Sequence, residues 1–146
     1  MSVLLDTNIL TRSGQPGHPM HASALNAVSS LRIRGEDLCI VPQKLVEFWT
    51  VATRPLSANG LGMTTAQART ELGRIKSFFR FLRDDAMIYD EWEKLVTRHA
   101  VSGKNSYDAR LVAAMNVHGI GALLTFNGVD FKRFQGITVI SPPDVR

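Results

Sequence analysis

The segment Val3-Leu4-Leu5-Asp6-Thr7-Asn8 decides the fold, because it places an acidic residue directly after a short apolar run. An apolar run of about four residues bounded by polar ones is typical of a buried parallel strand. In open parallel sheets, ligands bind beyond the carboxyl ends of the strands. Asp6 is therefore expected at the functional edge of a sheet, although it could also simply cap a following helix.

Apolar segments and turn signals alternate along the rest of the chain. Strands are predicted at residues 2–5, 38–41, 86–88, 122–125 and 137–140. Helices are predicted at residues 21–34, 43–53, 64–83 and 106–118, and another starts near Asp90. Short strands separated by helices indicate an α/β fold with a parallel sheet covered on both faces. No stretch resembles a linker, so residues 1–146 are expected to form a single domain.

Composition narrows the function classes. The chain has 146 residues, of which 45% are hydrophobic and 21% charged, as is usual for a globular protein. Cys39 is the only cysteine, which excludes an internal disulfide and a cysteine-based zinc site. No apolar run of about 18 residues and no leader-like segment is present, so a cytoplasmic protein without a membrane span is expected. The net charge of +4 and pI of about 9.6 favour a polyanionic partner.

Asp108 combines an acidic side chain with an apolar helix face. The residues three, four and seven positions after it are Leu111, Val112 and Met115. The helix dipole favours an acid in the first turn, but an exposed position would serve equally well. Because this helix returns to the amino end of the strand at residues 122–125, its own start lies near the carboxyl edge. Asp108 is therefore expected near Asp6.

Three further polar residues are candidates on weaker grounds. Glu47 falls on the polar side of its predicted helix, as an ordinary solvated glutamate would. Asn127 lies two residues beyond the strand at 122–125, but Asn127-Gly128 is also a good turn pair. Asp130 could instead simply cap a short helix at residues 131–134.

A shared pocket for these side chains would crowd negative charge. Like charges a few ångströms apart cannot all stay ionised unless a cation joins them. Mg²⁺ and Mn²⁺ accept oxygen ligands of this type, so the pattern indicates a metal-dependent hydrolase. The chain has no glycine-rich dinucleotide fingerprint, complete P-loop or Gly-x-Ser-x-Gly elbow, which disfavours nucleotide-driven, redox and serine-hydrolase chemistry.

In combination, the four acidic fragments resemble the motifs of the PIN-domain ribonucleases, and among them the VapC-like toxins of bacterial type II toxin–antitoxin pairs. The matching segments are Leu4-Leu5-Asp6-Thr7-Asn8-Ile9-Leu10, Val46-Glu47-Phe48-Trp49 with Ala52-Thr53-Arg54-Pro55, Tyr107-Asp108-Ala109-Arg110-Leu111-Val112-Ala113-Ala114, and Leu124-Thr125-Phe126-Asn127 with Asp130-Phe131. The resemblance runs from about Ser2 to Pro142. It implies a PIN-like three-layer α/β/α sandwich with a short-stranded, mostly parallel central sheet.

The resemblance also implies a catalytic site. Asp6, Glu47 and Asp108 would hold one or two Mg²⁺ or Mn²⁺ ions, directly or through water. Members of the family often carry an acid where Asn127 stands. Asn127 would then supply a neutral oxygen or hold a water, and Asp130 would supply the fourth charge.

The implied activity is that of an endoribonuclease toxin that cleaves RNA, such as a tRNA or another translation RNA, and inhibits translation. Expected supporting roles are water ordering by Thr7, Asn8 and Thr125, capping of the Asp108 helix by Ser106, and phosphate contacts from Arg12, Lys104 and Arg110. The implied partners are an antitoxin that lies in a hydrophobic groove and a second copy of the chain. The aromatic residues at 78–82, expected on one helix, are a candidate contact surface.

Two other functions share these features: a housekeeping RNA-processing PIN nuclease and a catalytically inactive PIN-fold interaction protein. A haloacid-dehalogenase-like phosphatase also begins with an Asp after a strand. That class needs a second Asp where Asn8 stands, which excludes it here.

Overall fold

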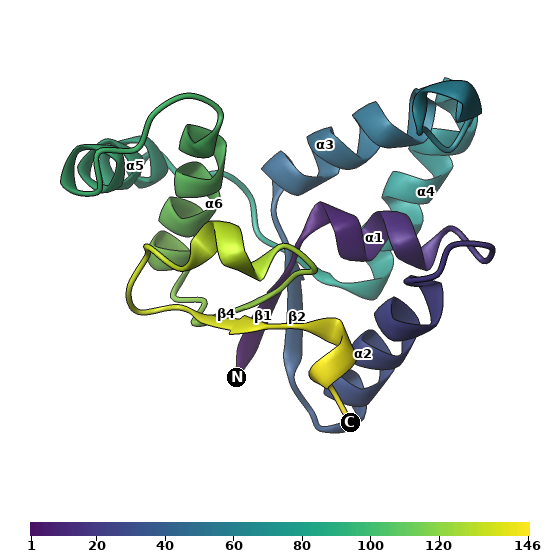
Figure 1. Ribbon diagram of the computed structural model, residues 1–146, viewed down its shortest axis with the longest axis horizontal. Coiled ribbons are helices and arrows are strands. Elements are labelled where there is room, and N and C mark those ends of the chain that lie inside the picture. The colour runs from purple at the N-terminus through teal and green to yellow at the C-terminus, as the bar shows by residue number, and fades with distance from the viewer.

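The computed structural model describes residues 1–146 (Figure 1). Its strands are β1 Ser2–Leu5, β2 Asp37–Ile40, β3 Arg80–Phe81, β4 Ala122–Leu124 and β5 Thr138–Ile140. Its α-helices are α1 Thr7–Ser13, α2 His21–Ile33, α3 Pro42–Thr53, α4 Thr65–Phe78, α5 Met87–Arg98 and α6 Asn105–His118. Short 3-10 helices follow at Leu56–Ala58, Gly128–Phe131 and Pro142–Asp144. All strand pairs are parallel, which confirms the predicted α/β class.

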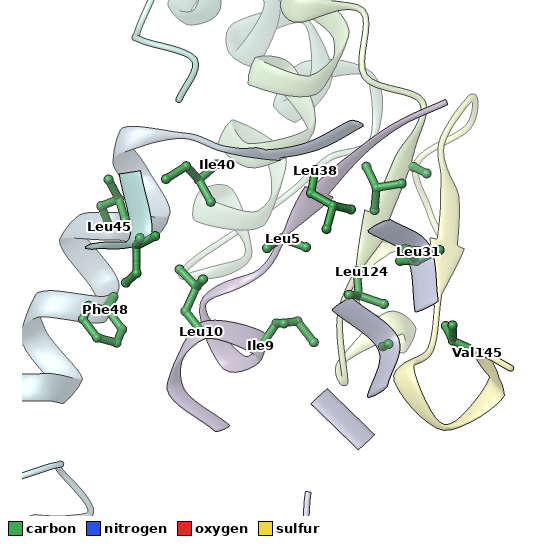
Figure 2. Close-up of a cluster of buried hydrophobic side chains, with 14 of the residues drawn as sticks. Leu5, Ile9, Leu10, Leu31, Leu38, Ile40, Leu45, Phe48, Leu124 and Val145 are labelled. Carbon is green, nitrogen blue, oxygen red and sulfur yellow. The ribbon is translucent and has the colours of Figure 1, made fainter. Parts of the chain in front are cut away.

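Alternating residues of each strand bury the two faces of the sheet. Val3 and Leu5 join a core that also contains residues of α1 to α4, whereas Leu4 joins a core formed with α5 and α6. Figure 1 shows α5 and α6 on one side of the sheet and α1, α3 and α4 on the other. In Figure 2, Leu5 and Leu124 of neighbouring strands lie beside Ile9 of α1. The result is a three-layer arrangement with the sheet in the middle. No helix is both long enough and apolar enough to cross a membrane.

The centre of the sheet sets the position of the site. In the strand order β3-β2-β1-β4-β5, the chain runs outward from β1 to one edge and then returns to β4 on the other side of β1. Such a reversal opens a crevice at the carboxyl ends of the two central strands. The backbone N–H of Asp6 donates to the carbonyl of Leu124 at 3.0 Å, so the residues that follow β1 and β4 are neighbours.

Two predictions between residues 64 and 90 are wrong. The helix expected at 64–83 ends at Phe78, and the strand expected at 86–88 lies instead at Arg80–Phe81. Residue 87 begins α5, three residues before the predicted start of that helix. The aromatic residues at 78–82 therefore do not share one helix.

The edge of the sheet explains why the chain leaves the helix there. Arg80 forms a 2.6 Å ion pair with Asp37 on the adjacent strand β2. Phe79 and Phe81 pack against the core on the α1 to α4 side. Aromatic side chains favour strands where cross-strand neighbours cover them, a tertiary effect that helical periodicity does not reveal.

Candidate active site

A polar cleft of about 370 Å³ opens at the carboxyl ends of β1 and β4. The structure brings all five candidate residues to its lining: Asp6, Glu47, Asp108, Asn127 and Asp130. They come from the end of β1, from α3, from the first turn of α6 and from the segment after β4. Cationic side chains line the same cleft, namely Arg12, Lys44 and Arg54.

Asp6 is fixed on both of its oxygens. Oδ1 accepts the backbone N–H of Thr7 at 2.7 Å, and Oδ2 accepts the hydroxyl of Thr125 at 2.7 Å. Asp6 is the N-cap residue of α1 and is only 6% exposed. Asp6 therefore caps helix α1 and also lines the cleft, so the two positions that the sequence suggested for it are compatible.

Asn8 and Thr125, expected to order waters, are engaged with protein groups. The side-chain amide of Asn8 donates to the Thr125 hydroxyl oxygen at 3.2 Å and accepts the N–H of Phe126 at 3.3 Å. The N–H of Asn127 donates to the same hydroxyl oxygen at 3.0 Å. These contacts fix the start of the segment that carries Asn127 and Asp130.

Lys44 is the functional residue that sequence reasoning missed. Its Nζ lies 3.1 Å from Oδ1 of Asp6 and 2.8 Å from Oε2 of Glu47, and the residue is 4% exposed. Burial alone would lower the pKa of Lys44, but the negative charges of Asp6 and Glu47 hold this pKa above its ordinary value. Lys44 is therefore an ammonium ion. A lysine on an otherwise buried helix position was the available signal, since such a charge needs a partner.

Glu47 is held in the cleft from two sides. Its Oε2 accepts the hydroxyl of Thr7 at 2.9 Å as well as the ammonium of Lys44. The side chain is still 40% exposed, as its place on the polar side of α3 predicts. Contacts with other elements, and not helical periodicity, direct this glutamate inward.

Asp108 has no hydrogen-bond partner among the side chains around it. Burial raises the pKa of Asp108 above its ordinary value; Lys44 opposes this, while Asp130, Asp6 and Glu47 raise the pKa further. Neither Asp108 nor Asp130 forms an ion pair, so Lys44 is the only cation paired with the four carboxylates. The cleft thus holds more negative charge than its own partners compensate.

The donor set suits a hard divalent cation, because it consists of carboxylate and carboxamide oxygens. In this conformation no three acidic, histidine or cysteine side chains are close enough to hold an ion jointly. Two of the four carboxylates are instead drawn together by Lys44. The oxygen donors and the excess negative charge of the cleft suit a divalent cation. The ammonium of Lys44 occupies the space between Asp6 and Glu47.

Three of the expected supporting roles need correction. Ser106 lies inside α6 instead of capping it, and its carbonyl accepts the indole N–H of Trp92 at 2.8 Å. Lys104 does not line the cleft. Arg110 donates to Gln43 at 3.1 Å and is held outside the cleft lining. The sequence indicated that these residues lie near Asp108, but it did not indicate where their side chains point.

Arg54 lines the cleft beside the expected Arg12. It follows the last residue of α3, and the N–H of Gly62 donates to its carbonyl at 2.8 Å. A Cβ on Gly60 would lie 2.1 Å from that carbonyl, so only glycine allows the returning loop to pass so closely. Arg54 lies seven residues after Glu47, a helical repeat that in the sequence places it on the same side as Glu47, although α3 itself ends at Thr53 and Arg54 is extended.

The sequence from residue 3 to residue 137 matches the PIN domain family. The chain belongs to this family. The cleft of this PIN domain is the place where the four acidic motifs of the sequence meet. No individually curated protein matches the sequence.

Solved structures share the fold of this PIN domain over nearly its whole length. VapBC2 from Rickettsia felis, bound to a DNA fragment from the promoter, matches with a TM-score of 0.72 at 18% identity, covering 97% of this chain and 98% of that one. VapC20 from Mycobacterium tuberculosis, a sarcin-ricin loop cleaving toxin, matches with a TM-score of 0.68 at 20% identity, covering 89% of this chain and 93% of that one. FitAcB from Neisseria gonorrhoeae matches with a TM-score of 0.66 at 18% identity, covering 97% of this chain and 99% of that one. The expected PIN-like three-layer fold is confirmed.

Proposed function

We propose that this PIN domain is a Mg²⁺- or Mn²⁺-dependent endoribonuclease and the toxin of a toxin–antitoxin pair. One observation carries the proposal: four carboxylates from separate parts of the chain line one cleft at the β1/β4 crevice, with a single paired ammonium among them. Membership of a family of nucleases supports the same activity. The basic net charge of +4 suits an RNA substrate.

Asp6, Glu47 and Asp108 would hold the ion, Asp130 would supply a fourth charge, and Asn127 a neutral oxygen. A bound divalent ion would activate a water for attack on a phosphodiester and stabilise the leaving oxygen. The chain itself fixes Asp6 through two hydrogen bonds, which keeps one ligand in place before any ion arrives.

Cationic side chains at the cleft provide for the substrate. Arg12 and Arg54 line the cleft, and neither is paired with a carboxylate. A guanidinium binds phosphate oxygens with charge-assisted hydrogen bonds, so these residues would hold the phosphates that flank the scissile bond. The structural similarity to the sarcin-ricin loop cleaving VapC20 supports a translation RNA as the substrate class.

An apolar groove of about 380 Å³ supports the toxin assignment. Helix α1 divides it from the cleft, presenting Ile9 and Leu10 to the groove and Thr7 and Arg12 to the cleft. An antitoxin segment seated in the groove would lie next to the catalytic carboxylates. The similarity to a toxin–antitoxin complex from Klebsiella pneumoniae, with a TM-score of 0.64 at 20% identity, supports this partner.

A homodimer is proposed on a second apolar surface. A hollow beside α3 is lined by Val46, Trp49 and Phe81, and Val46 is 66% exposed. A second copy covering this surface would bury these side chains. Val46→Asp should then shift the protein to a monomer in size-exclusion chromatography with light scattering, and an unchanged size would contradict this surface.

The activity is tested by RNA cleavage with Mg²⁺ or Mn²⁺, with EDTA, and with Asp6→Asn and Asp108→Asn. We expect chelation and either substitution to reduce cleavage at least 100-fold, while Asp144→Asn, on an exposed turn, leaves it unchanged. Circular dichroism should show that all variants stay folded. Cleavage that survives chelation and both site substitutions would refute the proposal.

Growth assays separate the three biological roles. Expression of the chain alone should arrest growth, and co-expression of the neighbouring open reading frame should relieve the arrest. A housekeeping nuclease would cleave RNA without arresting growth. An inactive interaction protein would neither cleave RNA nor bind Mn²⁺ in a titration.

A further inference from the structure

The ammonium of Lys44 lies between two carboxylates that approach it from different elements. Asp6 follows β1, Glu47 lies one turn after Lys44 on α3, and the two contacts measure 3.1 Å and 2.8 Å. At 4% exposure, Lys44 is among the few charged residues buried in this fold. Burying a lysine is costly unless it is paired and hydrogen-bonded, so these two carboxylates are what make its position tolerable.

The contacts of Lys44 determine which oxygens remain for a metal ion. Oδ1 of Asp6 faces the ammonium and Oδ2 faces the Thr125 hydroxyl, so both oxygens of this carboxylate are engaged. The Oε2 of Glu47 is engaged by Lys44 and Thr7. Asp108 accepts no hydrogen bond and forms no ion pair, so its carboxylate is free. The uncompensated charge of the cleft lies on the side of α6.

We infer that Lys44 is a built-in cation that replaces one divalent ion of a two-ion site, so that this cleft binds a single Mg²⁺ or Mn²⁺ per chain. This inference rests on the proposed nuclease function. In two-ion nucleases a pair of ions about 3.5–4 Å apart is bridged by carboxylates. Here the ammonium already bridges Asp6 and Glu47, and the single ion would be held by these two carboxylates on their side toward Asp108.

Charge balance favours one ion. At full charge, the four carboxylates together with Lys44, Arg12 and Arg54 leave one net negative charge in the cleft, and a single divalent ion turns it into one positive charge. A second divalent ion would leave three positive charges in the cleft, next to the two guanidinium groups. Lys44 is a positioning residue in this account, because it sets the places of Asp6 and Glu47 without touching the RNA.

The test counts bound ions. Isothermal titration and electron paramagnetic resonance with Mn²⁺ should find one ion per wild-type chain. Lys44→Met keeps an unbranched side chain that is one atom shorter, and it removes the charge. This variant should bind two ions, the first at least tenfold more tightly than the wild type binds its single ion. Lys94→Met, an exposed lysine on α5, should match the wild type.

Thermal unfolding provides a second measurement that does not depend on activity. Without metal, Lys44→Met leaves the buried Asp6 and the partly exposed Glu47 without their shared cation, so it should unfold at a lower temperature than the wild type and gain more from Mn²⁺. If Lys44→Met does not fold without metal, the double variant Lys44→Met/Glu47→Gln should. It removes the repulsion between the carboxylates of Asp6 and Glu47.

Each other outcome has one meaning. Two ions per wild-type chain, or an unchanged ion count and affinity in Lys44→Met, would overturn the role of Lys44 and leave the nuclease proposal standing. Wild-type protein that binds no Mn²⁺ and cleaves RNA in EDTA would overturn the nuclease mechanism itself.

Discussion

The hydroxyl of Thr125 donates a 2.7 Å hydrogen bond to Oδ2 of Asp6, across 119 residues of chain. The same hydroxyl oxygen accepts the side-chain amide of Asn8 and the N–H of Asn127. Thr125 is 1% exposed, so its hydroxyl cannot turn to water instead. One side chain thereby joins the ends of β1 and β4 and fixes the orientation of Asp6, a proposed metal ligand.

Thr125→Val should therefore damage both stability and catalysis. Valine matches threonine in shape but leaves the buried Asp6 carboxylate without the hydroxyl donor, which costs roughly 1–3 kcal/mol of unfolding free energy. RNA cleavage should fall at least tenfold, because Asp6 loses its alignment. Thr125→Ser keeps the hydroxyl and should stay within about threefold of the wild type in cleavage, as measured alongside urea unfolding. Equal losses in both variants would contradict a role for the hydroxyl.

Asp108→Asn should make the metal-free protein more stable while it abolishes cleavage. Burial raises the pKa of Asp108, and Asp130, Asp6 and Glu47 raise it further against the opposing effect of Lys44. A raised pKa in the folded state means that wild-type stability is lost as the pH rises from the ordinary value of 3.8 through the raised pKa.

The variant should accordingly be more stable than the wild type at pH 7, by at most about 1 kcal/mol, because solvent screens the charge of this partly exposed side chain. The gain should shrink below pH 4, where both proteins are neutral at this position. Urea unfolding at several pH values in EDTA measures it. A variant less stable than the wild type at pH 7 would show that Asp108 has a structural role.

The fold was predictable wherever local pattern and tertiary packing agree. The strand at Ser2–Leu5 and the helix around Asp108 were found within one residue, because an apolar run and an apolar helix face are both local signals. The error at Arg80–Phe81 arose because an edge strand of two residues depends on its neighbour β2 and on the ion pair with Asp37. Nothing local marks such a strand.

The sequence indicated the acidic residues of the site but only one of its three cations, Arg12. Asp6 and Asp108 follow from topology, because both lie where parallel strands end. Glu47 came only from the family resemblance, since its helix face looks solvated and a contact from Thr7 turns it inward. Lys44 and Arg54 were not singled out. Local signals pointed to each of them, but their places in the cleft depend on contacts with Asp6 and with the loop that contains Gly60.

Asp130, and not Asn127, should complete the set of charged ligands. Asp130 is close enough to Asp108 to raise its pKa, whereas Asn127 contributes its backbone N–H to Thr125. Asp130→Asn should weaken Mn²⁺ binding at least tenfold, and Asn127→Ala should weaken it less than threefold. Titration with Mn²⁺ decides between them, and the reverse order would assign the ligand to Asn127.

Gly60→Ala should destabilise the protein and weaken RNA binding together. The new methyl group would lie 2.1 Å from the carbonyl of Arg54, so the loop must move, at a cost of roughly 1–3 kcal/mol or more. Arg54 would move with it, and the KM for RNA should rise at least threefold. Gly73→Ala, in α4 with open space around it, should instead stabilise by roughly 0.5–1 kcal/mol. Urea unfolding and cleavage kinetics measure both; an unchanged KM in Gly60→Ala would remove Arg54 from substrate binding.

Phe78→Asp should separate toxicity from its neutralisation. Phe78 is 53% exposed, lines the apolar groove, and lies under the guanidinium groups of Arg32 and Arg74 at 5.8 Å. A charge there would oppose the seating of an apolar antitoxin segment, while the carboxylate cleft lies beyond α1 and stays intact. We expect cleavage within about twofold of the wild type and growth arrest that the neighbouring open reading frame no longer relieves.

Met87→Asp provides the matched control, because Met87 is 63% exposed at the start of α5 and lies outside the groove. Relief of arrest in the Phe78 variant equal to that in the control would place the antitoxin on another surface.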